Sequence, residues 1–106
     1  MIIARFTQLP KGFSAVTIEG HAGYADKGED IVCAAVSSAF QLCANGITEI
    51  LGEKALVTVH ENKTGIALPQ NAQDATVAFL SALHLHLLLL QEQYPQNIQL
   101  TITKEG

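Results

Sequence analysis

His21 and Cys33 are the two residues of this sequence whose types and spacing best suit covalent chemistry. A cysteine thiolate in contact with an imidazolium is a strong nucleophile, and the histidine can then protonate a leaving amine. Cys33 follows Asp30, a good helix N-cap, by three residues, so its thiol falls in a first helical turn, where N–H groups and the helix dipole favour a thiolate. Position alone fits equally well a cysteine that packs the helix start, and His21 taken alone fits a solvated loop histidine.

Polar and glycine residues around this pair are candidates for supporting roles. Asp30 has two compatible roles, capping the helix and orienting His21, and capping is the stronger prediction. Ser37, one turn beyond Cys33, either lines a pocket or is a small polar residue at the helix margin. The segment Gly20–Glu29 has no periodicity and is predicted to be a loop, long enough that a function is expected for it. Its candidate substrate-contacting residues are Gly20, Ala22, Gly23, Tyr24 and Gly28.

Cys43 is the second of the two cysteines, and it projects from the middle of the apolar side of the same predicted helix. Ten residues of helical rise separate it from Cys33 by about 15 Å, which is beyond the reach of a disulfide. Cys43 is therefore predicted to be a small buried hydrophobe. A redox-sensor role for Cys33 is the weakest hypothesis, because Cys43 is too distant to resolve an oxidised thiol.

The three remaining histidines give no metal-binding pattern. His84 and His86 differ by about 200° around a helix, so they cannot hold one metal ion from one face. His60 is predicted to be an exposed strand residue. The sequence has no zinc or calcium spacing, no glycine-rich phosphate loop and no GxSxG nucleophile turn, so we expect neither a metal nor a cofactor.

Two helices and five strands, in the order ββαββαβ, are predicted to position these residues. Runs of β-branched and aromatic residues indicate the strands, and apolar residues spaced by about 100° indicate the helices. The expected class is α+β: a mixed, mainly antiparallel sheet that carries two helices in a single domain over residues 1–106. The predicted segments are strands Ile2–Thr7 and Phe13–Glu19, helix Ile31–Leu51 ending at Gly52, strands Ala55–Glu61 and Gly65–Leu68, a helix from Asn71 to about Gln93, and strand Ile98–Thr103.

Local turn and cap signals refine three of these boundaries. Leu9–Gly12 is predicted to be the turn of the first hairpin. Asn62–Thr64 is predicted to be the turn of the second hairpin, with Gly65 in the left-handed conformation. Asn71 and Asp74 have the spacing of a capping box at the start of the second helix.

The composition favours a compact soluble domain and disfavours several classes of function. Hydrophobic residues make up 48% and charged residues 15% of the 106, which excludes a disordered chain. The net charge of -4 disfavours direct nucleic-acid binding and suits a basic peptide or protein partner. The first residues lack the pattern of a signal peptide, and the apolar stretch Val77–Leu90 is shorter than a membrane span. We therefore expect a cytoplasmic protein without a membrane anchor.

The second helix carries apolar residues on two nearly opposite sides. A single sheet face covers one stripe, and soluble monomers rarely leave a second one exposed. We therefore expect a homodimer through this helix; the alternative is that the first helix or a terminal segment covers the second stripe. The first stripe is Thr76, Phe79, Leu80, Leu83, Leu87 and Leu90, and the second is Val77, Ala78, Leu85, Leu88 and Leu89.

The run from Gly20 to Ser37, GHAGYADKGEDIVCAAVS, resembles the signature of the bacterial ribosomal-processing cysteine protease family, Prp. The family pattern is Gly-His, a loop of small residues, Gly-x-Asp and then Val-Cys-Ala-Ala-Val-Ser, and every part is present. The resemblance implies that His21 and Cys33 are the catalytic pair, accompanied by the polar residues Asp30 and Ser37. It further implies a homodimer whose substrate is the amino-terminal extension of the twenty-seventh large-subunit ribosomal protein, cut beside an aromatic residue so that the ribosome can mature.

These residues support two hypotheses of function. In the first, the protein is a cysteine endopeptidase: Cys33 attacks a peptide carbonyl, first-turn N–H groups stabilise the oxyanion, and His21 protonates the departing amine. This hypothesis includes closure of the Gly20–Glu29 loop, which brings His21 toward Cys33. In the second, the protein is a non-catalytic ribosome-assembly module that binds a basic protein tail, and Cys33 only packs.

Overall fold

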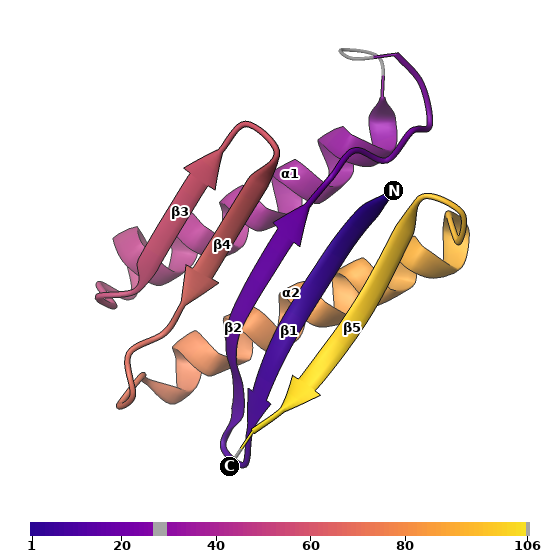
Figure 1. Cartoon of the computed structure of the whole chain (residues 1–106). Coiled ribbons are helices and arrows are strands. Elements are labelled where there is room, and N and C mark those ends of the chain that lie inside the picture. The colour runs from indigo at the N-terminus through magenta and orange to yellow at the C-terminus, as the bar shows by residue number, and fades with distance from the viewer. Residues whose placement is uncertain (27–29, 106) are drawn as a thin grey trace.

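The computed structural model describes residues 1–26 and 30–105, and it confirms the predicted order of elements and the α+β class. A five-stranded sheet carries both long helices on one face, so the molecule has two layers (Figure 1). The elements are β1 (Ile2–Leu9), β2 (Gly12–Glu19), α1 (Ile31–Asn45), η1 (Gly46–Ile50), β3 (Leu56–His60), β4 (Lys63–Ala67), α2 (Asp74–Gln93) and β5 (Ile98–Lys104).

The sheet is mixed and mainly antiparallel, as predicted, with the strand order β3-β4-β2-β1-β5. β1 runs parallel to β5, and the other three strand pairs are antiparallel. Pro10 and Lys11 join β1 to β2 within the predicted first turn. Buried residues such as Ala4, Phe6 and Val16 alternate with less buried ones along these strands. One face of the sheet therefore belongs to the core, and the helices cover it.

The first helix is confirmed in extent, and it has two parts. η1 continues α1 as a π-helix to Ile50, and Gly52, with a φ of +65°, follows its end. Ile47 in η1 is fully buried, so the π-helical segment belongs to the same packed side. The predicted apolar side of this helix packs into the core, except for Ile50 at its end, which is 80% exposed. The buried residues of α1 are Val32, Val36, Phe40, Cys43 and Ala44.

The turn of the second hairpin lies earlier in the chain than its local sequence predicts. β4 begins at Lys63, so Glu61 and Asn62 form the turn, and the predicted turn over Asn62–Thr64 is wrong. The predicted left-handed Gly65 is also wrong, because this residue lies inside β4 and its φ is not positive. The physical reason is that β4 pairs with β2 and with β3 from its first residue onward. Two ladders of hydrogen bonds outweigh the turn preference of three residues.

The start of α2 also differs from the prediction. The helix begins at Asp74, and its N-cap Gln73 makes no side-chain capping bond, so the predicted box of Asn71 and Asp74 is wrong. Glu53, from the segment after η1, takes this role: its Oε1 accepts from the Gln73 N–H at 2.8 Å and from the Thr76 hydroxyl at 3.0 Å. The Gln73 N–H is the main cause of the lowered pKa of Glu53. A carboxylate distant in sequence therefore satisfies this helix start.

α2 buries the first of its two predicted stripes and leaves much of the second exposed. Leu85 is 56% and Leu89 47% exposed, so no other part of the described chain covers them. By length and mean hydropathy, 1.5 for Ile31–Ile50 and 1.3 for α2, both helices could cross a membrane. Each of them nevertheless packs one side into the core against the sheet. The buried residues of α2 are Thr76, Leu80, Leu83, Leu87 and Leu90.

Candidate active site

The four predicted polar site residues come together where β2 ends and α1 begins. His21, Asp30, Cys33 and Ser37 line one cavity of about 580 Å³. His21 follows β2, whereas the other three belong to the cap and the first two turns of α1. The remaining lining residues are Gly23, Ala25, Asp26 and Ala34. The fold thus places the thiol and the imidazole at one opening in the surface.

Asp30 is the N-cap of α1, as predicted. Its Oδ1 accepts from the N–H groups of Val32 at 3.0 Å and Cys33 at 2.9 Å. Its Oδ2 accepts from the N–H of Tyr24 at 3.1 Å, which ties the loop to the helix start. These backbone bonds, the one from Cys33 above all, lower the pKa of the Asp30 carboxyl. The carboxylate therefore positions backbone around the thiol, and within the described part of the chain no hydrogen bond joins it to His21.

The thiol of Cys33 is partly exposed and has a backbone donor pointed at it. The N–H of Ala22 lies 3.2 Å from Cys33 Sγ, and Ala22 itself is 2% exposed. The N–H groups nearest the thiol in α1 are already occupied: those of Val32 and Cys33 by the Asp30 carboxylate, and that of Ala34 by the Asp30 carbonyl at 3.1 Å. An oxyanion would have to compete with Asp30 for these three N–H groups, and the expected oxyanion role of the first turn stays a prediction.

The loop residues after β2 are placed individually. Gly20 has a φ of +94°, and an added Cβ would lie 2.4 Å from the carbonyl oxygen of Met1, so glycine is required there. His21 is exposed, and the described residues contain no hydrogen bond between its imidazole and Cys33 Sγ. The Tyr24 ring meets the Tyr94 ring edge-on, with centroids 5.5 Å apart. Gly28, also predicted to contact substrate, lies outside the described residues.

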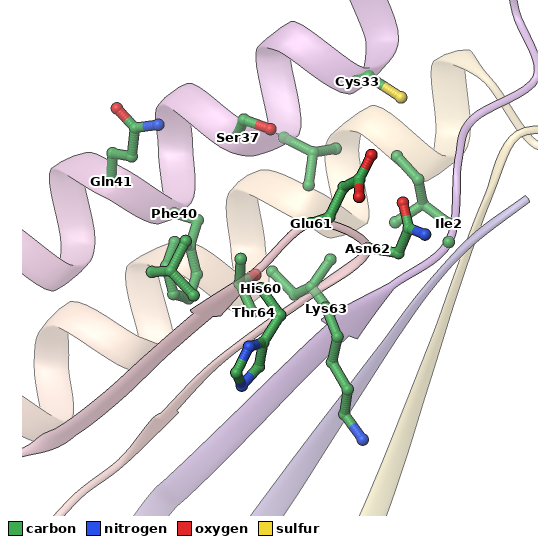
Figure 2. Close-up of a pocket in the computed structure, with 14 residues that line it drawn as sticks. Ile2, Cys33, Ser37, Phe40, Gln41, His60, Glu61, Asn62, Lys63 and Thr64 are labelled. Atoms are coloured by element: carbon green, nitrogen blue, oxygen red, sulfur yellow. The ribbon is translucent and has the colours of Figure 1, made fainter.

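A second cavity, of about 250 Å³, opens on the other side of Cys33 and Ser37. It runs between α1 and the tip of the β3–β4 hairpin, with Phe40 in its wall (Figure 2). The Glu61 carboxylate reaches from the hairpin toward α1, while His60 and Lys63 point away (Figure 2). Ser37 lines both cavities, as the pocket-lining alternative for this residue predicts. No local sequence signal indicates the hairpin's part in the site, because only the sheet brings the hairpin near Cys33.

Cys43 has the environment of a structural residue. It is 4% exposed, and burial raises the pKa of its thiol to about 11. The thiol donates to the carbonyl oxygen of Phe79, with 3.6 Å between Sγ and O. Both cysteines are free, so the prediction of a buried, unbridged Cys43 is confirmed.

Of the remaining histidines, His60 belongs to the hairpin that lines the smaller cavity, and the other two lie on α2. His84 packs against the rings of Phe6 and Phe13, and burial lowers its pKa. His86 borders a groove between α1 and α2, and His60 is exposed, as predicted. Within residues 1–26 and 30–105, no three His, Cys, Asp or Glu side chains are grouped so as to hold a metal ion.

A partly exposed thiol in the first turn of a helix, which accepts a backbone N–H and shares a cavity with a histidine, is an arrangement typical of thiol-dependent hydrolases. The family model for the cysteine protease Prp matches residues 1–99. The chain therefore belongs to this family and is a cysteine protease.

Solved structures agree with this assignment at the level of the fold. The essential ribosomal processing protease Prp of Staphylococcus aureus, with a covalently linked product peptide, matches with a TM-score of 0.91 and 24% identity, covering 97% of this chain and all of that one. The same protease with a substrate peptide gives 0.86 and 24% at the same coverage. SMU.848 from Streptococcus mutans gives 0.86 and 25%, covering 99% of this chain and 96% of that one. No curated protein matches the sequence.

Proposed function

We propose that this cysteine protease removes the amino-terminal extension of the twenty-seventh large-subunit ribosomal protein, cutting beside an aromatic residue, and so supports ribosome maturation. The observation that carries the proposal is the similarity over almost the whole chain to a ribosomal processing protease that was captured with substrate and product peptides. The signature residues His21 and Cys33 lie at one cavity, which supports their roles as acid and nucleophile.

In the proposed reaction, Cys33 Sγ forms a bond to the scissile carbonyl carbon, and the π electrons of the carbonyl move onto its oxygen. Collapse of this tetrahedral intermediate breaks the C–N bond, and the amine leaves with the proton of the His21 imidazolium. Water then adds to the thioester and gives a proton to His21, and the thiolate departs as the new carboxyl group forms. His21 must approach Cys33 for these transfers, which fits a loop that closes on the substrate.

The surface around Cys33 suits an extended peptide with one aromatic side chain. Cavities open on two sides of the thiol, so a chain laid across Cys33 has a space on either side. The smaller cavity is lined by apolar groups that include Ile18, Val36 and Phe40, which suits an aromatic ring. Carboxylates also border the site, Asp26 on one side and Glu61 on the other. They favour the approach of a basic protein.

The test is cleavage of a peptide that carries the ribosomal extension from the same organism. Wild-type protein and a Cys43→Ala control should cut it at one position, and Cys33→Ala should not. Cleavage by Cys33→Ala would overturn the proposed mechanism. The competing hypothesis, a non-catalytic assembly module that grips a basic tail, requires that wild-type protein bind this peptide without cutting it.

We also propose that the protein acts as a homodimer in the cytoplasm. Leu85 and Leu89 on α2 are exposed, and a groove of about 490 Å³ lies between α1 and α2. Leu42 on α1 borders this groove and is 72% exposed. Alanines line much of the groove floor, so a helix from a second copy can approach closely. A second copy covers this patch without any other partner.

A further inference from the structure

The backbone of Ala22 is held at both of its polar groups, and each contact comes from a different part of the chain. Its N–H donates to Cys33 Sγ at 3.2 Å, and its carbonyl oxygen accepts from the side-chain amide of Asn97, Nδ2, at 2.8 Å. Ala22 is 2% exposed, and both contacts are partly buried. The orientation of this N–H toward the sulfur therefore depends on a residue far away in sequence.

Asn97 is itself fixed by its backbone. It lies in the turn between α2 and β5, where its carbonyl oxygen accepts from the N–H of Ile2 at 2.9 Å. Its own N–H donates to the carbonyl oxygen of Tyr94 at 3.0 Å. The residue whose side-chain amide contacts Ala22 is thus bonded to the start of β1 and to the C-cap residue of α2. A side chain fixed in this way holds a neighbouring backbone group in one orientation better than a residue of a free loop does.

The position of the Ala22 N–H is that of an oxyanion donor. When Sγ bonds to a carbonyl carbon, the carbonyl oxygen becomes negatively charged next to the sulfur, and a donor about 2.7–3.1 Å from that oxygen stabilises it. The N–H groups of Val32, Cys33 and Ala34 already donate to Asp30, so an oxyanion would have to displace the helix cap to reach them. The Ala22 N–H faces the sulfur directly. Its hydrogen bond to the sulfur weakens as the sulfur becomes bonded to carbon, which leaves the N–H free to donate to the oxyanion.

We propose that the N–H of Ala22 donates to the oxyanion of the tetrahedral intermediate, and that Asn97 is the positioning residue that aims it. In the resting enzyme the N–H donates to Sγ; in the intermediate it donates instead to the oxygen that has received the electron pair. No proton moves in this exchange. The inference rests on the proposed role of Cys33 as the nucleophile.

Asn97→Asp tests the positioning role. The aspartate keeps the shape of the side chain but has no N–H to donate, and its carboxylate repels the carbonyl oxygen of Ala22. We expect kcat for peptide cleavage to fall by about 10- to 100-fold, while KM changes less than about twofold. Gln96→Glu is the matched control, because it adds the same charge at the neighbouring exposed residue. A merely structural role of Asn97 would instead lower kcat and thermal stability together.

Replacement of the Ala22 amide by an ester tests the donor itself. Residues 1–32, carrying lactic acid in place of alanine at position 22, can be ligated to residues 33–106 at the native Cys33, and an all-amide chain made in the same way is the control. We expect kcat to fall by about 10²–10³-fold. Alkylation by iodoacetamide, which displaces iodide without forming an oxyanion, should slow by less than about tenfold.

These measurements separate the inference from the function on which it rests. An unchanged kcat in the ester protein would overturn the donor role, and so would a fall in the alkylation rate as large as the fall in kcat. Peptide cleavage by Cys33→Ala would instead overturn the nucleophile itself. Loss of cleavage in Cys33→Ala together with a normal kcat in the ester protein would leave the protease mechanism intact and reject the role of Ala22 alone.

Discussion

α1 carries two thiols that differ in almost every respect that governs reactivity. Cys33, in the first turn, is partly exposed, accepts a backbone N–H and borders two cavities. Cys43, in the last turns, is 4% exposed and donates to a carbonyl oxygen, and burial raises its pKa to about 11. The residue type and the helix are the same, so the reactivity of a cysteine depends on the donors and acceptors around its sulfur.

The largest expected effect distinguishes the two thiols by activity. Cys33→Ser should lower kcat/KM at least about 1,000-fold, because a hydroxyl is a much poorer nucleophile at this position. Cys43→Ser should keep activity within about twofold and cost about 1–2 kcal/mol of unfolding free energy, because it buries a hydroxyl in an apolar site. Steady-state cleavage and urea unfolding of the two variants measure both. Equal losses of activity in the two variants would show that Cys33 and Cys43 do not differ in catalytic importance.

The thiols should also differ in alkylation. Limited iodoacetamide at pH 8 should label Cys33 at least about 100 times faster than Cys43, since a thiol of pKa about 11 is about 0.1% thiolate at that pH. Mass mapping of the folded protein identifies the labelled residue, and full labelling in urea is the control for Cys43. Predominant label on Cys43 in folded protein would reverse the assignment.

The next effect concerns Asp30, which organises the backbone around the reactive thiol. Asp30→Asn keeps an oxygen to cap Val32 and Cys33, but its amide cannot accept from Tyr24, whereas Asp30→Ala loses all three bonds. We expect Asp30→Asn to keep thermal stability while kcat/KM falls about tenfold, and Asp30→Ala to lose both. Wild-type stability in the asparagine variant together with full activity would show that the Tyr24 contact is unimportant.

The lowered pKa of Asp30 gives this contribution a pH dependence. A carboxyl whose pKa is lower in the folded state stabilises the fold above its unfolded pKa, about 3.9, and loses that contribution as pH falls through the folded pKa. The stability gap between wild type and Asp30→Ala should therefore be constant near neutral pH and shrink below about pH 4. Melting curves of both proteins from pH 7 to pH 2.5 measure the gap. A gap that is independent of pH would exclude the ionised cap.

The smallest expected effect concerns the surface beside Cys43. Cys33 borders cavities that suit a peptide, whereas Cys43 borders the groove between α1 and α2, which we propose a second copy covers. Sedimentation equilibrium at micromolar concentration should give twice the monomer mass, and Leu85→Glu or Leu89→Glu should halve it. Leu56→Glu, which charges a leucine exposed on β3, is the control. A monomeric wild type would reject the dimer.

Short-range interactions made much of this protein predictable from its sequence. The Asp30 cap acts over three residues, and apolar periodicity within α1 placed Cys43 in the core. The ββαββαβ order likewise follows from periodicity and breakers inside each segment. The site residues His21 to Ser37 lie close in sequence, so a local signature also found them.

Only the tertiary structure decided the features that join distant segments. Glu53 accepts the hydrogen bond of the α2 N-cap, and pairing with β2 makes Lys63 part of β4. The hairpin that carries Glu61 lines the smaller cavity of the site. In our proposal Asn97 orients the N–H of Ala22 as the oxyanion donor, whereas the local sequence predicted that first-turn N–H groups of α1 are the donors. Apart from the hairpin wall, each of these features depends on which group a hydrogen-bond donor or acceptor pairs with. A donor or acceptor can be assigned only when all the groups that compete for it are in place, and folding brings those groups together from the whole chain.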